Sequence, residues 1–278
     1  MNGVTENMGN DAPRKQCMLT IEQNRRSALL ALTPLDQEYC LVFTKSEMAR
    51  GTRTRLEGSQ DIYKLRQHAY FRENAELLPL HEDILHELRV LQSKYYPSIL
   101  VLNFVFLDEF VFERLSSTLH GRMPRRLDLC IVKIDEKLKL CHSLVDAKIS
   151  MLFVTSKDRD QMAIFDEEFL CEFANGSDTA VTLTVKNDTC NWENLPDNFT
   201  PSDDFLPIIS KYQELVLEPL TLTAPQLVEV ISVRMEAASG IVHWQFSLTS
   251  ALEERDLDHF RNFRHFAISR KAGKYVIR

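Results

Sequence analysis

The chain has 278 residues, of which 44% are hydrophobic and 26% are charged, so it is long enough to bury one large core or two modest ones. Its net charge of −7 opposes binding to nucleic acid and to anionic membrane surfaces. No apolar run approaches the roughly 20 residues of a membrane-spanning helix. The first residues also lack the apolar stretch of a signal peptide. We therefore expect a cytoplasmic or nuclear protein with no nucleic-acid or membrane partner.

The first part of the chain is predicted to hold a tail, a helical unit and a capping helix. Residues 1–16 are polar and without periodicity, which is typical of a flexible tail. In residues 17–60, leucines at helical spacing and a break at Thr33-Pro34 predict a small helical unit. Residues 61–97 begin as a charged connector and continue as an amphipathic helix that Pro97 ends. This helix is expected to cap the structure that follows.

After residue 97, a frame with apolar residues at its first, third, sixth and eighth positions occurs three times. The copies are Leu100, Leu102, Val105, Leu107; Leu127, Leu129, Val132, Ile134; and Leu215, Leu217, Leu220, Leu222. Strand-like runs begin 24 to 34 residues apart, close to the period of leucine-rich repeats. These runs are Ile99–Phe106, Leu127–Ile134, Met151–Val154, Val181–Val185, Leu215–Leu217 and Val242–Leu248. Helical patterns separate them.

Local signals support the same arrangement. Thr223 and Gln226 form a capping-box pattern at the start of one helix. Segments 266–268 and 275–277 predict a terminal hairpin that covers the last open edge of the sheet. Residues 98–278 are therefore predicted to form an irregular leucine-rich-repeat-like array of strand-turn-helix units, which makes the fold class α/β. One unit cannot bury its strand alone, so stacked neighbours complete the core.

Such an array offers several candidate partner contacts. Val101 and Val216 would lie on the outward ladder, where either a binding surface or a covering layer explains apolar side chains. Trp244 alternates with Val242 and Phe246, which predicts that it points inward. Trp192 lies in a polar loop and is the better surface anchor. Basic residues near the C-terminus are candidates for binding an acidic peptide; they include Arg264, Arg270 and Lys271.

The sequence shows no motif of catalysis, and we expect no cofactor and no metal. His81 and His86 bracket two carboxylates, but five residues on an α-helix place the two imidazoles about 140° apart, whereas zinc ligands share one face. Adjacent carboxylates elsewhere are typical of solvated helix starts. The fingerprints of common hydrolases, nucleotide triphosphatases and dinucleotide-binding enzymes are missing, and only eight glycines are present.

Two segments carry a family resemblance. The first is Gln213–Phe246, with LVLEPLTLTAPQLVEVI followed by HWQF, together with the ending FAISRKAGKYVIR. The second is ALLALTPLDQEYCLVFTKSEMARGTR. They resemble nematode F-box-associated, leucine-rich-repeat-like proteins and the later part of a degenerate F-box, respectively, although the customary Leu-Pro opening is absent. The resemblance implies contacts with the adaptor subunit of an SCF-type ubiquitin ligase at Leu29, Leu32, Leu35, Tyr39 and Leu41.

These observations together favour a non-enzymatic protein-binding module. It would recognise a protein substrate or an acidic peptide, as the resemblance implies for a substrate-recognition subunit of an SCF-type ubiquitin ligase. Two alternatives stay open at this stage. One is an enzyme whose α/β active site has no recognisable motif, which would show a deep pocket lined by convergent polar residues. The other is a diverged binding protein with no link to ubiquitin ligation.

Overall fold

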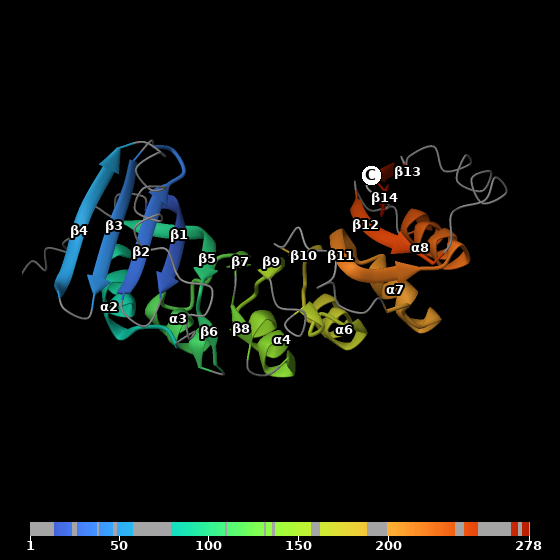
Figure 1. Ribbon diagram of the computed structural model, residues 1–278, viewed down its shortest axis with the longest axis horizontal. Coiled ribbons are helices and arrows are strands. Elements are labelled where there is room, and N and C mark those ends of the chain that lie inside the picture. The colour runs from blue at the N-terminus through green and yellow to red at the C-terminus, as the bar shows by residue number, and fades with distance from the viewer. Residues whose placement is uncertain are drawn as a thin grey trace, which may run out of the picture.

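The computed structural model of the chain describes residues 14–23, 27–37, 39–46, 49–57, 79–108, 110–130, 132–134, 137–156, 162–187, 199–236, 242–249, 268–271 and 274–277. These residues form an α/β fold, as the sequence predicted, with helices along one face of a long sheet (Figure 1). None of the helices in these ranges is long and apolar enough to cross a membrane.

The strands and helices alternate along most of the chain. The strands are β1 (Lys15–Gln23), β2 (Ser27–Pro34), β3 (Tyr39–Ser46), β4 (Ala49–Glu57), β5 (Tyr95–Asn103), β6 (Phe106–Leu107), β7 (Arg126–Cys130), β8 (Lys133–Ile134), β9 (Met151–Ser156), β10 (Val181–Asn187), β11 (Tyr212–Leu222), β12 (His243–Leu248), β13 (Ile268–Lys271) and β14 (Lys274–Ile277). The α-helices are α2 (Glu82–Leu91), α3 (Val111–Thr118), α4 (Lys137–Asp146), α6 (Glu167–Asn175), α7 (Leu206–Ile209) and α8 (Ala224–Glu236). A short 3-10 helix, η2 (Asp203–Phe205), precedes α7.

Twelve of the strands form one mixed sheet in the order β13-β14-β12-β11-β10-β9-β7-β5-β1-β2-β3-β4. The seven strands from β12 to β1 run parallel to one another. Of these, β5, β7, β9, β10, β11 and β12 follow one another across the sheet in the order of the chain. Both ends of the sheet are antiparallel. The parallel, adjacent strands that the repeated frame predicted are therefore present.

The register of the parallel strands explains the repeated frame. Its first positions are paired neighbours across the sheet, and they form one row of buried side chains. That row is Leu19, Leu100, Leu127, Leu152, Leu183, Leu215 and Trp244. The sixth and eighth positions of the first two copies are also buried, at the short parallel pair β6 and β8. All twelve frame residues lie in the hydrophobic core, as predicted.

The prediction of a helical N-terminal unit is wrong, because its described residues form the strands β1 to β4, which pair antiparallel with one another in chain order. Successive residues of β2 alternate between two buried clusters: Leu30 and Leu32 belong to the main core, whereas Leu29 and Ala31 belong to a second cluster. A strand that is buried on both faces appears in the sequence as a continuous apolar run. Such a run cannot be distinguished from a helix by periodicity alone.

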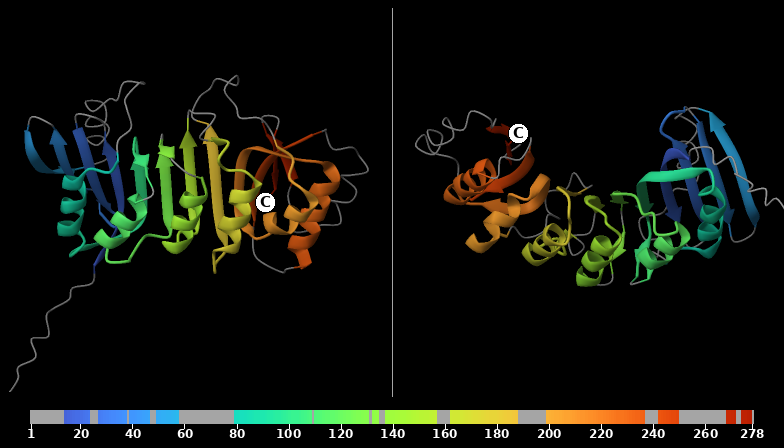
Figure 2. Two further views of the ribbon diagram at one scale, coloured as in Figure 1. Left: turned by 90° about the horizontal axis from the view of Figure 1, so that it is seen from below. Right: turned by 180° about the vertical axis from the view of Figure 1, so that it is seen from behind.

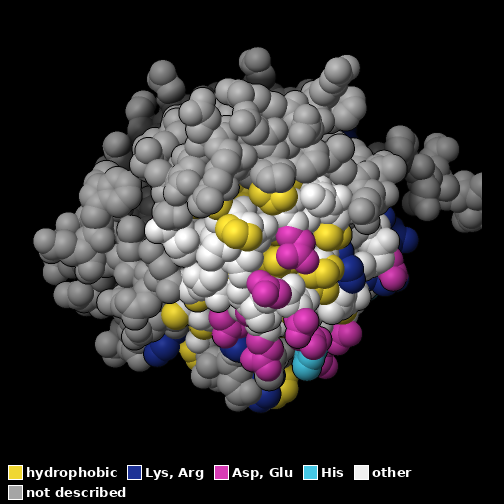
Figure 3. Space-filling model, turned by 90° about the vertical axis from the view of Figure 1, so that its right-hand side faces the viewer, with side chains coloured by type: hydrophobic (Ala, Val, Ile, Leu, Met, Phe, Trp, Pro, Cys, Tyr) yellow, Lys and Arg dark blue, Asp and Glu magenta, His cyan; other side chains and the backbone are white. Residues whose placement is uncertain are grey.

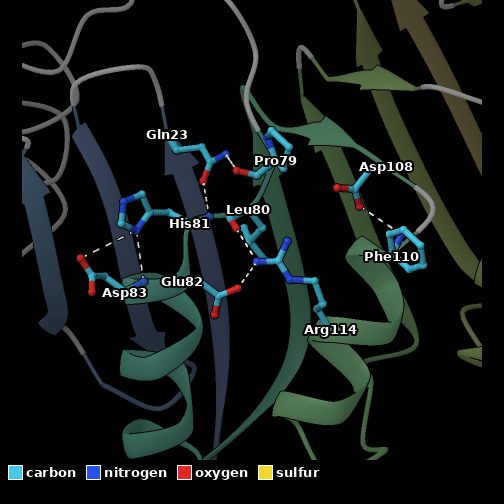
Figure 4. Close-up of polar contacts among 9 residues, drawn as sticks. All are labelled: Gln23, Pro79, Leu80, His81, Glu82, Asp83, Asp108, Phe110 and Arg114. Atoms are coloured by element: carbon cyan, nitrogen blue, oxygen red, sulfur yellow. Dashed lines mark hydrogen bonds and ion pairs between the residues drawn. The ribbon is translucent and has the colours of Figure 1, made fainter.

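Helix α2 is present as predicted, and three contacts set its position (Figure 4). The His81 Nδ1 atom accepts a hydrogen bond from the backbone N–H of Asp83, which caps the helix start. The Gln23 amide contacts the Pro79 carbonyl at 2.7 Å and the His81 backbone N–H at 3.1 Å, which ties that start to β1. Pro97 does not end α2, contrary to the prediction, because the helix stops at Leu91 and Pro97 lies inside β5.

The predicted terminal hairpin is confirmed for its described part, since β13 and β14 are antiparallel and β14 pairs with β12. The core near this end is aromatic. The Trp244 indole N–H donates to the Tyr212 carbonyl at 3.0 Å, and the Tyr212 hydroxyl donates to the Leu170 carbonyl at 2.8 Å. Both side chains are fully buried, and Trp244 points inward as predicted. Burial raises the pKa of Tyr212 well above its ordinary value.

The predicted capping box opens α8. The Thr223 backbone N–H donates to Gln226 Oε1 at 3.0 Å, and the Gln226 backbone N–H donates to the Thr223 hydroxyl at 3.3 Å. We expect Thr223→Ala to lower the free energy of unfolding by about 1 kcal/mol, because it removes one half of this box. Urea denaturation would measure the loss. Thr223→Ser keeps the hydroxyl and should stay within about 0.5 kcal/mol of the parent protein; equal losses in both variants would contradict the cap.

Candidate functional site

None of the described helices covers the face of the parallel strands that lies opposite to α3, α4, α6 and α8. In Figures 1 and 2 the sheet bends into an open arc, with the helices on its outer side and this face on its inner side. Side chains that alternate with the buried row point to it. We call this surface, where β5, β7, β9, β10 and β11 contribute to it, the free face. Its paired positions are Ile99, Arg126, Met151, Thr182 and Glu214 in one row, and Val101, Asp128, Phe153, Thr184 and Val216 in the next.

A charged and aromatic cluster occupies the middle of the free face. Arg126 donates two hydrogen bonds to Asp128, from Nε to Oδ1 at 2.9 Å and from Nη2 to Oδ2 at 3.0 Å. Its guanidinium carbon also lies 4.2 Å from the centre of the Phe153 ring on the neighbouring strand. The two residues of the ion pair are two apart on β7, which places both side chains on one face of the strand. We call Arg126, Asp128 and Phe153 the Arg126 cluster.

The ion pair is partly buried, and the guanidinium stays charged. The side chains of Arg126 and Asp128 are 36% and 19% exposed. The hydrogen bonds to Asp128 raise the pKa of Arg126, partial burial opposes this effect, and the charge of Asp128 followed by that of Glu214 raises it further. Glu214 also accepts a hydrogen bond from the Thr184 hydroxyl at 3.1 Å. The free face is therefore held in a defined arrangement across four neighbouring strands.

Accessibility is greatest where the Arg126 cluster lies. Met151 is 37% exposed, and Ile99, Val101 and Phe153 are half-buried. Towards β11 the same face closes, because Thr182, Thr184 and Val216 are buried. Of the two explanations for apolar ladder residues, burial therefore applies to Val216, whereas Val101 remains partly accessible. The structure places them on one face, as the alternation predicted, but only Val101 lies beside accessible apolar side chains.

The residues implied as adaptor contacts do not form one surface. Leu29 and Leu32 are buried in different clusters, whereas Leu35 is 53% exposed in the turn after β2. Tyr39 and Leu41 are half-buried on β3, and the Tyr39 hydroxyl lies 3.1 Å from that of Tyr95. This scatter follows from the correction of the fold, since neighbouring positions of a strand point to opposite sides.

The remaining predicted contacts are only partly covered by the structure. Trp192 and Arg264 lie outside the described residues. Arg270 and Lys271 belong to β13, the strand at the C-terminal edge of the sheet. The surface near this end also carries charge: in Figure 3, Asp and Glu side chains gather next to a group of hydrophobic ones. Lys and Arg side chains are also visible in this view, towards its edges.

No group of three or more His, Cys, Asp and Glu side chains among the described residues has the arrangement of a metal site. His81 caps α2, while His86 is exposed on the same helix. The five described cysteines form no disulfide, and burial raises the pKa of both Cys17 and Cys141 to about 12. These two thiols are therefore poor nucleophiles at neutral pH.

Comparison with known proteins identifies no relative: no family model, curated protein or solved structure matches the chain. The free face itself is the main guide to function. Sequence analysis found one of its accessible residues, Val101, and missed Arg126, Met151 and Phe153. The signal for them was present in the segments RLDLC and MLFVTS, where polar or aromatic residues alternate with the buried ones.

Proposed function

We propose that this protein is a recognition module that binds an extended segment of a partner protein on the free face. The observation that carries the proposal is the Arg126 cluster, which lies among accessible apolar side chains on a sheet face that none of the described helices covers. The series of strand-turn-helix units resembles a leucine-rich-repeat array, and arrays of that kind bind partners on their inner, concave surface. The repeated frame that predicted the array supports the proposal as well.

The chemistry of the cluster indicates the kind of segment that would bind. Arginine and aromatic side chains contribute more binding energy at protein interfaces than most residue types do. Asp128 occupies Nε and Nη2 of Arg126, and no described residue accepts a hydrogen bond from its Nη1. A carboxylate or a main-chain carbonyl of a partner could accept there, while apolar partner side chains contact Met151 and Phe153. An acidic segment with interspersed apolar residues fits best.

The test compares two phenylalanines on opposite sides of the protein. Phe153 lies on the free face, and Phe110, which is 52% exposed, lies at the start of α3 on the helical side. A photo-crosslinking phenylalanine analogue is placed at either position in the full chain, and covalent products are identified by mass spectrometry. We expect a specific partner to be captured from position 153 and not from position 110. Capture from position 110 alone would contradict the proposal.

Affinity for the captured partner then gives a quantitative prediction. We expect Phe153→Ala to weaken binding at least about tenfold, because it removes both the apolar contact and the support of the Arg126 guanidinium. Arg126→Lys should weaken it comparably, since lysine lacks the planar fork that pairs with Asp128 and stacks on the ring. Phe110→Ala is the matched control and should leave the affinity unchanged. Unchanged affinity in both free-face variants would refute the assignment of the site.

The link to ubiquitin ligation remains a separate proposal that rests on the sequence resemblance. Because the described part of this region consists of strands and a turn, an adaptor subunit would have to contact β2, β3 and the turn after β2, where Leu35 is exposed. A binding assay between the full chain and an SCF adaptor subunit decides this point. Saturable binding that Leu35→Asp abolishes supports the link. No binding at high concentration removes it and leaves the recognition module without a ubiquitin-ligase role.

A further inference from the structure

A pocket of about 450 Å³ lies at the other end of the molecule from the C-terminus, between α2 and strands β3 and β4. Phe43, Lys45, Gly51, Arg53, Asp83, His86 and Glu87 line it. It is separate from the free face, because these strand residues point to the side of the sheet on which α2 packs. Its volume falls within the range of small-molecule sites.

Gly51 makes the pocket possible. A Cβ atom at this position would lie 2.3 Å from Cε2 of Phe43, far inside van der Waals contact, so the Phe43 ring lies over the backbone of β4 where any other residue would place a side chain. Phe43 pairs with Arg53 across the two strands. The ring thus provides an apolar wall beside charged side chains.

In the pocket, the carboxylates have partners, whereas some of the hydrogen-bond donors have none in the part of the chain that the structure describes. Arg53 donates from Nε and Nη2 to the two carboxylate oxygens of Glu87, at 2.6 and 2.8 Å, and Glu87 is only 3% exposed. The ammonium of Lys45 lies 3.4 Å from Asp83 Oδ2, beyond a short charged hydrogen bond. Nη1 of Arg53 and the His86 ring have no hydrogen-bond partner among the described residues. The carboxylates are therefore already engaged, whereas donors remain available from three different elements.

We propose that this pocket binds a small anionic ligand in which an oxyanion is joined to a flat apolar group. Lys45, Arg53 and His86 would donate to the oxyanion, and the Phe43 ring would contact the apolar group. Arg53 is prearranged by Glu87, so little side-chain freedom is lost when its remaining donor binds. This site is independent of the free face and of its protein partner.

Benzenesulfonate is the test probe, because its charge does not change between about pH 6 and pH 8 and a ring is attached to its oxyanion. We expect saturable binding to the full chain, with a dissociation constant on the order of 1 mM, measured by ligand-observed NMR or calorimetry. Sulfate alone and benzyl alcohol should bind at least several-fold more weakly, because sulfate lacks the ring and benzyl alcohol lacks the oxyanion. Tighter binding of phenyltrimethylammonium than of benzenesulfonate would overturn the charge assignment.

Two substitutions with opposite expected signs locate the site. Lys45→Gln should weaken benzenesulfonate binding about tenfold, because a charged donor is lost. Asp83→Asn should strengthen it several-fold, because the carboxylate that attracts Lys45 and repels the probe becomes neutral. Arg89→Gln, an exposed change on the same helix outside the pocket lining, is the control for loss of one positive charge. Equal effects of Lys45→Gln and Arg89→Gln would overturn the proposal.

A substitution tests His86. Its ring lines the pocket together with Lys45 and Arg53. His86→Ala should weaken binding of benzenesulfonate several-fold, because it removes a donor to the oxyanion. His142→Ala, an exposed change on α4, should leave the binding unchanged. Equal affinities of His86→Ala and the parent protein would overturn the role of this histidine in the site.

Discussion

Replacing Trp244 by alanine is expected to lower the free energy of unfolding by about 4 kcal/mol. The side chain is fully buried at the point where β12 pairs with β11, and its indole N–H satisfies the Tyr212 carbonyl. The substitution leaves a cavity that the surrounding strands fill only partly, and it leaves a buried carbonyl without its donor. For a chain of this size, such a loss corresponds to a decrease of about 10 °C in the melting temperature.

Circular dichroism during urea denaturation measures this effect without depending on tryptophan fluorescence. Trp244→Phe separates the two contributions, because it keeps most of the volume and removes only the hydrogen bond. We expect it to cost about 1 to 2 kcal/mol. Losses below about 1 kcal/mol for Trp244→Ala would show that this aromatic position is not part of a tightly packed core, contrary to the structure.

The second large effect is expected from two adjacent residues of β9. Leu152 is fully buried in the row of paired leucines, and Met151, next to it, points to the free face and is 37% exposed. Leu152→Asp places an unpaired carboxylate in the core and should cost at least about 5 kcal/mol, enough to prevent folding of many proteins. Met151→Asp should change the free energy of unfolding by less than about 1 kcal/mol.

The pair is a matched comparison because the same substitution is made one residue apart on one strand. Soluble expression, circular dichroism and thermal melting distinguish the two variants. If both fold, the row of leucines is not in the core, and if both fail to fold, the free face is not accessible at β9. Met151→Asp has a second expected consequence, since it should weaken binding of an acidic partner segment without unfolding the protein.

The free face and the pocket at α2 both arise because successive side chains of a strand point to opposite sides of the sheet. On β7 and β9, the leucines point into the core, whereas Arg126 and Phe153 point to the free face. On β3 and β4, Phe43, Lys45 and Arg53 point to the side where α2 packs. Binding of a protein segment and of a small anion would thus use opposite sides of one continuous sheet. Occupation of either site can be assayed without the other.

The central array could be predicted because its signal is local and repeated. Each copy of the frame places leucines two residues apart, which indicates a strand with one face in the core, and Thr223 with Gln226 marks a helix start within four residues. The N-terminal strands could not be predicted in this way. Leu29 to Leu32 are consecutive buried residues, and their alternation between two clusters becomes visible only when the covering layers are known.

The sequence by itself determined the α/β class, the parallel series of strands and the burial of the twelve frame residues, because periodic apolar side chains must be buried together. Only the tertiary structure decided that the first strands form an antiparallel extension of the same sheet. It also decided which outward residues meet, since Arg126 contacts Phe153 and Arg53 contacts Glu87 over separations of 27 and 34 residues. Contacts of this kind depend on strand register and helix packing, which no short stretch of sequence encodes.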